Sequence, residues 1–190
     1  MQNKMAHFER REALSKPVRE DVRKAAVLLL LFSRDARWHT VLIRRKAIDG
    51  DVHSGQISFP GGRMQHHETP EQAAIRETFE EIGCAPENIT TLGRLTELHI
   101  PVSNHLVFPV VGYLDSYSGW MPQESEVAQI FEVPLTQFLV SDATTRTEIR
   151  LGDGLILRDV PSYEAQGQII WGATAMILSE FSVLMEQIQP

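Results

Sequence analysis

Apolar residues in this chain occur in short runs separated by polar or glycine-containing segments, a spacing that predicts mostly strands. The longest run, AAVLLLLF at 25–32, has charged neighbours and is short, so we expect a strand buried on both faces. After a polar turn at 33–39, the run at 40–45 completes a predicted hairpin. Further strands are expected at 56–59, near 93–99, and at 107–114, 127–133, 147–151, 155–160 and 169–171.

Two strand predictions carry turn or proline signals. Pro109 interrupts the run at 107–114, which suggests a sheet edge or a bulge, because proline donates no ladder hydrogen bond. Asp153-Gly154 separates the runs at 147–151 and 155–160 and predicts a hairpin turn.

The segment at 70–82 has a helical period and clear end signals. Thr69 is a predicted N-cap, Pro70 suits the first helical position, and Gln72 completes a capping box. Gly83 is a left-handed helix terminator. At about 100° per residue, one face carries glutamates and the opposite face is predicted to be buried. The glutamates are Glu77, Glu80 and Glu81, and the buried face is Ile75, Thr78, Phe79 and Ile82.

A second long helix is expected at 172–186, where Ala175, Leu178 and Phe181 recur on one face, and a short helix is expected at 135–140. Residues 1–22 are polar and form either an arm or a short amphipathic helix, and 23–190 are expected to form a single domain. Strands mixed with a central and a terminal helix predict an α/β fold with a sheet between helices.

Composition narrows the classes of function. The net charge of −7 argues against bulk binding of nucleic acid, and an anionic substrate would need metal ions or a local basic patch. One cysteine excludes an internal disulfide and fits a reducing, cytoplasmic location. The charged N-terminal sequence predicts no signal peptide, and the apolar run at 25–32 is too short to cross a membrane.

Crowded glutamates need a reason to lie together, because like charges at helical spacing repel one another. Divalent cations between Glu77, Glu80 and Glu81 would supply that reason, since hard cations prefer several oxygen ligands. The alternative is a solvated helix face with an Arg76–Glu80 ion pair.

The spacing from Gly62 to Cys84 resembles the Nudix box. Every fixed glycine, glutamate and arginine of that pattern is present, and Thr78 is the one departure, where an aliphatic residue is usual. The matching positions are Gly62, Glu68, Arg76, Glu77, Glu80, Glu81 and Gly83. The resemblance implies an α/β/α Nudix sandwich with a mixed sheet and a metal-dependent hydrolase that cleaves a diphosphate linked to another group.

The resemblance also implies roles for individual residues. Glu77 and Glu81 would be primary ligands of Mg2+ or Mn2+, with Glu80 also close to metal, and Gly62, Glu68 and Arg76 would support them. Gly61 would let the backbone approach metal or phosphate. The base that activates water is assigned to Glu126, with Glu124 second and a solvated strand-edge carboxylate as the alternative.

Residues upstream of the box resemble the coenzyme A pyrophosphatase subgroup, in particular Ala47, Gly55 and Phe59-Pro60-Gly61-Gly62. Cleavage of CoA would give 3′,5′-ADP and 4′-phosphopantetheine. The chain departs from that subgroup where Asp51 replaces an expected arginine. Three bases, Arg44, Arg45 and Lys46, are expected to compensate by binding substrate phosphate, or else to form a solvated strand end.

Two alternatives to CoA hydrolysis stay open at this point. One is an enzyme that hydrolyses ADP-ribose or NADH. The other is a Nudix domain that binds a nucleotide as a sensor without cleaving it, although the complete box and the lack of a visible second domain favour an enzyme. The expected partner is a small nucleotide, with no nucleic acid and no membrane. The sequence leaves the oligomeric state open, a homodimer being one alternative.

Overall fold

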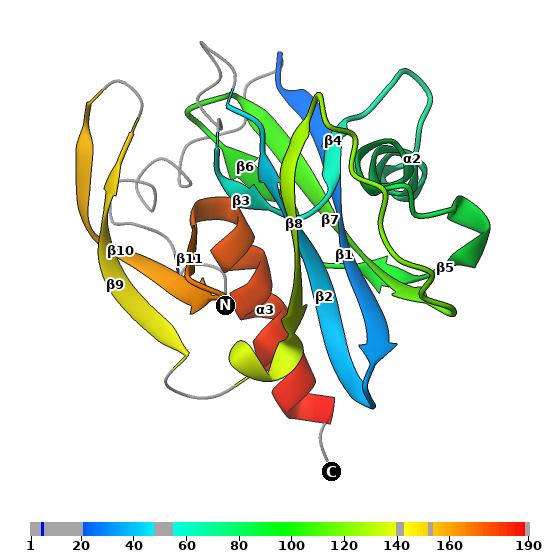
Figure 1. The fold of residues 1–190 in the computed structure, drawn as a ribbon. Helices are drawn as coiled ribbons and strands as arrows, with labels where there is room; N and C mark the ends of the chain where they lie inside the picture. Colours follow the sequence, from blue (N-terminus) through cyan, green and yellow to red (C-terminus); the bar gives the residue numbers. More distant parts are fainter. Residues whose placement is uncertain (1–4, 6–20, 48–54, 140–142, 152–153, 189–190) are drawn as a thin grey trace.

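The structure is a computed structural model that describes residues 5, 21–47, 55–139, 143–151 and 154–188. It contains a large mixed sheet with one helix on each face and a smaller antiparallel sheet beside the second helix (Figure 1). The mixed α/β fold predicted from the sequence is confirmed, and the three-stranded sheet is an addition to it. The predicted N-terminal arm or helix at 1–22 lies almost entirely outside the described residues.

Strand β1 (Arg23–Arg34) forms the centre of the large sheet. It pairs antiparallel with β2 (Arg37–Arg45) and β4 (Gly61–Arg63) along one edge and parallel with β7 (His105–Leu114) along the other. The hairpin predicted over 25–45 is therefore confirmed, and its turn lies at Asp35 and Ala36, both with positive φ.

The remaining strands of this sheet extend both of its edges. They are β3 (Ile57–Ser58) and β8 (Val127–Pro134), which pair with β2, and β5 (Ile89–Arg94) and β6 (Leu98–Ile100), which pair with β7. The single strand predicted near 93–99 was wrong, because the chain breaks there into β5 and β6. At this break the carboxylate of Glu180 accepts hydrogen bonds from the backbone and the hydroxyl of Thr96.

Pro109 does not lie on a sheet edge, so that part of the prediction was also wrong. It is buried in β7, which has strands on both sides. Its carbonyl accepts a hydrogen bond from Leu95, in the break between β5 and β6. The missing donor of the proline therefore faces no continuous ladder on that side.

Helix α2 (Pro70–Ile82) begins and ends where the sequence predicted. Thr69 and Gln72 form the reciprocal capping box, and Gly83 ends the helix in the left-handed conformation with φ 71°. The predicted buried face needs a correction. The buried residues are Ala73, Ala74, Thr78, Glu81 and Ile82, whereas Phe79 is 49% exposed.

The small side chains on α2 explain why its buried face differs from the predicted one. Ala73 and Ala74 pack with Leu28 and Leu30 of β1, which brings the helix close to the sheet. The hydroxyl of buried Thr78 is satisfied by the carbonyl of Ala74 at 2.7 Å. The face directed at the sheet thus includes one of the glutamates that the sequence assigned to the polar face.

Helix α3 (Gly172–Ile188) covers the opposite face of the large sheet. It also packs against the small sheet, which consists of β9 (Thr144–Arg150), β10 (Ile156–Ala165) and β11 (Gln168–Trp171). Because α3 lies between the two sheets, residues 174–182 are buried all round rather than on one face. The expected short helix at 135–140 is a 3-10 turn, Leu135–Gln137, and Val140 lies outside the described residues.

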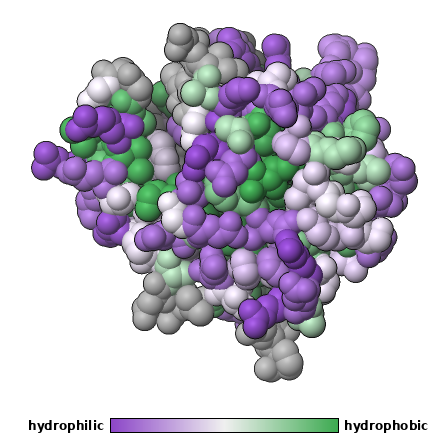
Figure 2. Space-filling view, viewed as in Figure 1, coloured by the Kyte–Doolittle hydropathy of each residue, from purple (hydrophilic) through white to green (hydrophobic). Residues whose placement is uncertain are grey.

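The hairpin of β9 and β10 projects beside the body of the molecule (Figure 1). Its predicted pairing is confirmed, with a bulge between Leu157 and Val160. The surface view in Figure 2 is largely hydrophilic but shows hydrophobic residues over this hairpin, where Leu155 is 53% exposed. Within the described part of the chain, no helix has the length and apolar character needed to cross a membrane.

Strand β4 yields a prediction about packing. A Cβ on Gly61 would lie 2.3 Å from the carbonyl oxygen of Ala26 and 2.6 Å from Cα of Val27. Gly61→Ala should therefore lower the free energy of unfolding by about 3 kcal/mol or more. Gly93→Ala is the matched control, since φ is +158° there against +148° at Gly61 and no atom lies within 4 Å of its added Cβ.

Urea denaturation of both variants measures this difference. The Gly93→Ala loss should be about 1–2 kcal/mol, the cost of the backbone conformation alone. Equal losses in the two variants would show that the contact between β4 and β1 does not exclude a side chain.

Candidate active site

Strand β4 and helix α2 lie side by side and bring Glu77 and Glu81, two of the three glutamates predicted on the polar face of α2, against a glycine backbone. A Cβ on Gly62 would be 2.5 Å from Oε2 of Glu77, so only glycine lets this carboxylate approach the strand. Burial raises the pKa of Glu77, an effect that Arg76 opposes and the charges of Glu80 and Glu126 reinforce.

Glu81 is the most buried of the three glutamates, with 2% of its surface exposed. Its Oε2 accepts a 2.8 Å hydrogen bond from the Gly61 amide, and its Oε1 lies 3.5 Å from Nη1 of Arg45. Burial raises the pKa of Glu81 to about 7 even though these two donors oppose the shift, and Glu77 and Glu126 add to it. This carboxylate is therefore held in place but poorly compensated in charge.

Arg76 organises the outer part of the site. Its Nε and Nη2 donate to the two oxygens of Glu68 at 2.6 and 3.0 Å, and its Nη1 donates to Glu77 at 2.8 Å and Glu80 at 2.9 Å. The hydrogen bonds from Arg76 lower the pKa of Glu68. Glu80 thus shares Nη1 of Arg76 with Glu77, and because its side chain is half exposed it lies at the outer rim of the site.

The segment 115–126 closes the site from the side of β8. Backbone amides of Met121 and Gln123 donate to the carbonyls of Ile82 and Glu81 at 2.9 and 2.8 Å, which joins this segment to the end of α2. Glu126, at its far end, is exposed, and its charge raises the pKa values of both Glu77 and Glu81. The charge of Glu126 therefore acts on both Glu77 and Glu81, and its role as the base stays a prediction.

The three bases at the end of β2 do not form one patch. Arg45 faces Glu81, whereas Arg44 donates to Gln168 of β11 and lies over the ring of Phe131, with Cζ 5.5 Å from its centroid. Nζ of Lys46 donates to the carbonyl of Glu124 at 2.5 Å. Alternation along the strand sends Arg44 and Arg45 to opposite faces of the sheet.

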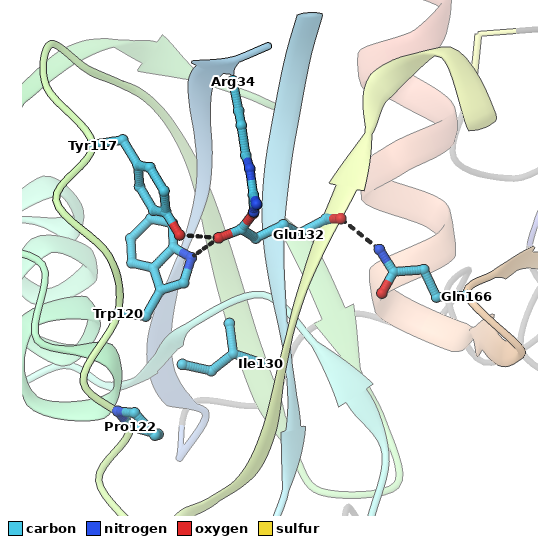
Figure 3. Close-up of a pocket in the computed structure, with 7 residues that line it drawn as sticks. All are labelled: Arg34, Tyr117, Trp120, Pro122, Ile130, Glu132 and Gln166. Carbon is cyan, nitrogen blue, oxygen red and sulfur yellow. Dashed lines mark hydrogen bonds and ion pairs between the residues drawn. The ribbon is translucent and has the colours of Figure 1, made fainter.

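A further carboxylate, which sequence reasoning missed, holds the segment 115–126 in place. Glu132 on β8 accepts hydrogen bonds from Tyr117, Trp120 and Arg34, and these contacts lower its pKa despite its burial (Figure 3). The Trp120 bond is 2.7 Å long. An acidic residue between apolar neighbours in a predicted strand was the signal available in the sequence.

These side chains line an open pocket of about 560 Å³ beside β8, completed by Pro122 and Ile130 and, on the other side of β8, by Gln166 (Figure 3). Nε2 of Gln166 donates to the backbone carbonyl of Glu132 at 2.5 Å. The polar groups around Glu132 are thus bonded to one another. The hydrogen bonds from Tyr117 and Trp120 to Glu132 therefore hold the segment 115–126 beside β8.

Comparison with known families and proteins gives a consistent result. A model of the NUDIX domain matches residues 22–151. A protein of Pectobacterium atrosepticum described as the uncharacterized Nudix hydrolase NudL is 32% identical over 169 residues, covering 88% of this chain and 85% of that protein. Nudix hydrolase 22, chloroplastic, of Arabidopsis thaliana is 31% identical over 182 residues, covering 92% of this chain and 59% of that protein.

Solved structures share the fold. The Nudix hydrolase RenU from M. smegmatis has a TM-score of 0.58 at 22% identity and 88% coverage of both chains. A binary complex of the C. elegans Ap4A hydrolase has a TM-score of 0.59 at 16% identity, covering 88% of this chain and 100% of that chain. The family model and the relatives show that the chain belongs to the Nudix family and is a Nudix hydrolase, an enzyme of the pyrophosphohydrolase type.

Proposed function

We propose that the protein hydrolyses the diphosphate bond of a small nucleoside diphosphate-linked substrate with the help of Mg2+ or Mn2+. The observation that carries the proposal is the pair of carboxylates held against the glycine strand β4, Glu81 buried and Glu77 partly buried. Withdrawing carboxylates from water costs free energy unless a positive charge compensates them, and a bound cation would supply that charge.

The donor set fits a hard cation. Both groups offer carboxylate oxygens, and burial raises the pKa of each, which shows that the negative charge there is under-compensated. Among the described residues no three acidic, histidine or cysteine side chains already converge as a finished cation cluster. Mg2+ needs no such cluster, because it is commonly held by one or two carboxylates together with substrate phosphates and water.

A bound cation would neutralise charge on the diphosphate and lower the pKa of a coordinated water. Glu77 and Glu81 would hold it, and Arg76, fixed by Glu68, orients Glu77. Glu80 is proposed as an additional ligand that would first have to leave Arg76. Glu126 is exposed beside the buried pair and is proposed to accept the proton of the attacking water.

For the substrate, we propose CoA or its derivatives, which would give 3′,5′-ADP and 4′-phosphopantetheine. The support is the resemblance of the residues before the box to coenzyme A pyrophosphatases. Arg44, Arg45 and Lys46 are proposed as phosphate contacts, and Gly61 as the backbone contact. The departure at Asp51 lies outside the described residues.

A substrate comparison tests this choice. Initial rates with CoA, ADP-ribose and NADH, each with Mg2+ and with Mn2+, should be highest for CoA. A higher rate with ADP-ribose or NADH would transfer the assignment to that substrate while leaving the cation site intact. EDTA should abolish every rate, and nucleotide binding without turnover would instead indicate a sensor.

The cation ligands yield a mutational prediction. Glu77→Gln and Glu81→Gln should each reduce kcat by about 100-fold or more, because a neutral amide is a poor ligand for a hard cation. Glu71→Gln is the matched control on the same helix, since Glu71 pairs with Arg94 on β5 instead. Circular dichroism should show the helix content unchanged in all three. Near wild-type turnover of the first two variants under saturating Mg2+ would contradict the assignment.

Burial of Glu81 also predicts a pH dependence of stability. Its pKa of about 7 in the folded protein lies above the ordinary value of 4.5, so the folded protein binds more protons between these pH values than the unfolded chain does. The stability contributed by this group is complete below about pH 4.5 and is lost as the pH rises to about 7. The loss is at most about 3 kcal/mol.

Urea denaturation in EDTA at pH 5, 6, 7 and 8 measures this loss. The free energy of unfolding should fall more steeply with pH in the wild type than in Glu81→Gln, which has no proton to lose. Saturating Mg2+ should reduce the difference, because a bound cation favours the ionised carboxylate. Parallel pH profiles of the two proteins in EDTA would contradict the prediction.

A further inference from the structure

The carboxylates of Glu77 and Glu81 have counter-ions that are held very differently. Arg76, beside Glu77, is fixed by two hydrogen bonds to Glu68 and one to the carbonyl of Arg63, at 2.6, 3.0 and 3.1 Å. Its guanidinium therefore stays in place whether or not Glu77 changes partner. Arg45, beside Glu81, has no comparable support.

The contact of Arg45 with Glu81 is long and single. Nη1 lies 3.5 Å from Oε1, and Glu81 is the only partner found for the Arg45 side chain in the described part of the chain. One third of the Arg45 side chain is exposed, whereas Glu81 is 2% exposed. Its backbone is fixed, because its amide donates to the carbonyl of Gln56 at 3.1 Å. The backbone of Arg45 is thus fixed, whereas its guanidinium is held by one long contact.

The geometry of Glu81 leaves room for one further partner. Oε2 is taken by the Gly61 amide, so Oε1 is the oxygen available to a cation, and Arg45 lies on that side. A divalent cation at Oε1 and a guanidinium at the same oxygen would repel each other, since two like charges about 4 Å apart interact unfavourably even in water.

We propose that Arg45 is an exchangeable counter-ion: it neutralises Glu81 in the cation-free protein, competes with the divalent cation for Oε1, and then binds a substrate phosphate. This inference rests on the proposed role of Glu81 as a cation ligand. Guanidinium groups bind phosphate through two parallel hydrogen bonds, so the released Arg45 gains a better partner than the one it leaves. Cation and substrate then favour each other's binding, because each removes a competitor of the other.

The proposal predicts that removing the positive charge of Arg45 raises the affinity for a divalent cation. Arg45→Met should bind Mn2+ more tightly than the wild type, by about tenfold, because it removes a positive charge roughly 6 Å from a dication. Arg45→Lys keeps the charge and should stay near the wild type. Arg44→Met is the matched control for Mn2+ affinity, since it removes the same charge from the neighbouring residue, which lies over Phe131 instead.

Electron paramagnetic resonance of free Mn2+ in titrations without nucleotide measures these affinities and needs no turnover. Tighter binding in Arg45→Met alone supports the exchange. Equal or weaker binding in Arg45→Met, or the same gain in Arg44→Met, overturns it. If Glu81→Gln binds Mn2+ as well as the wild type does, or if no variant binds it, the proposed cation site fails and this inference fails with it.

Substrate kinetics test the proposed contact of Arg45 with phosphate independently. With saturating Mn2+, Arg45→Met should raise KM for CoA by about tenfold or more, with a smaller change in kcat, because a charged hydrogen bond to phosphate is lost. Opposite changes in cation affinity and substrate affinity distinguish an exchanging group from a structural one. A variant in which both affinities fall would show that Arg45 only maintains the fold of the site.

Discussion

The close approach of helix α2 to strand β4 is the constraint on which the rest of the site depends. A Cβ on Gly61 would collide with the backbone of β1, and a Cβ on Gly62 would displace the carboxylate of Glu77. Alanines at 73 and 74 bring the helix near enough for this contact. The result is that Glu81 is buried and Glu77 partly buried, which raises their pKa values and makes a cation the natural compensating partner.

The positive groups beside Glu77 and Glu81 differ in how firmly they are held. The network of Arg76 with Glu68 is rigid and sets the orientation of Glu77. Arg45 makes one long contact and can leave it. Glu132 adds a second rigid point, since its carboxylate accepts from Tyr117 and Trp120 of the segment whose backbone also bonds to the carbonyl of Glu81.

The two faces of the large sheet serve different parts of the molecule. The face covered by α2 contains the carboxylates and Arg45, and this is where the diphosphate chemistry is proposed. The face covered by α3 adjoins the small sheet, and Arg44 links the two sheets through Gln168. A substrate that used both Arg44 and Arg45 would therefore have to pass around the end of β2 rather than across one surface.

The sequence by itself determined the elements whose signals are local. The capping box of Thr69 and Gln72, the stop at Gly83 and the apolar run of β1 all act within one or two turns or along one strand, so they could be identified without the fold. The same holds for the box spacing, which identified the family.

Only the tertiary structure decided which side of α2 is buried. Ala73, Ala74 and Thr78, whose hydroxyl donates to the carbonyl of Ala74, face the sheet, whereas Phe79 is exposed. The tertiary structure also decided that Arg45 faces Glu81, that Arg44 donates to Gln168, and that Glu132 holds the distant segment 115–126. Each of these depends on contacts between residues far apart in the chain, and periodicity along the sequence does not contain that information.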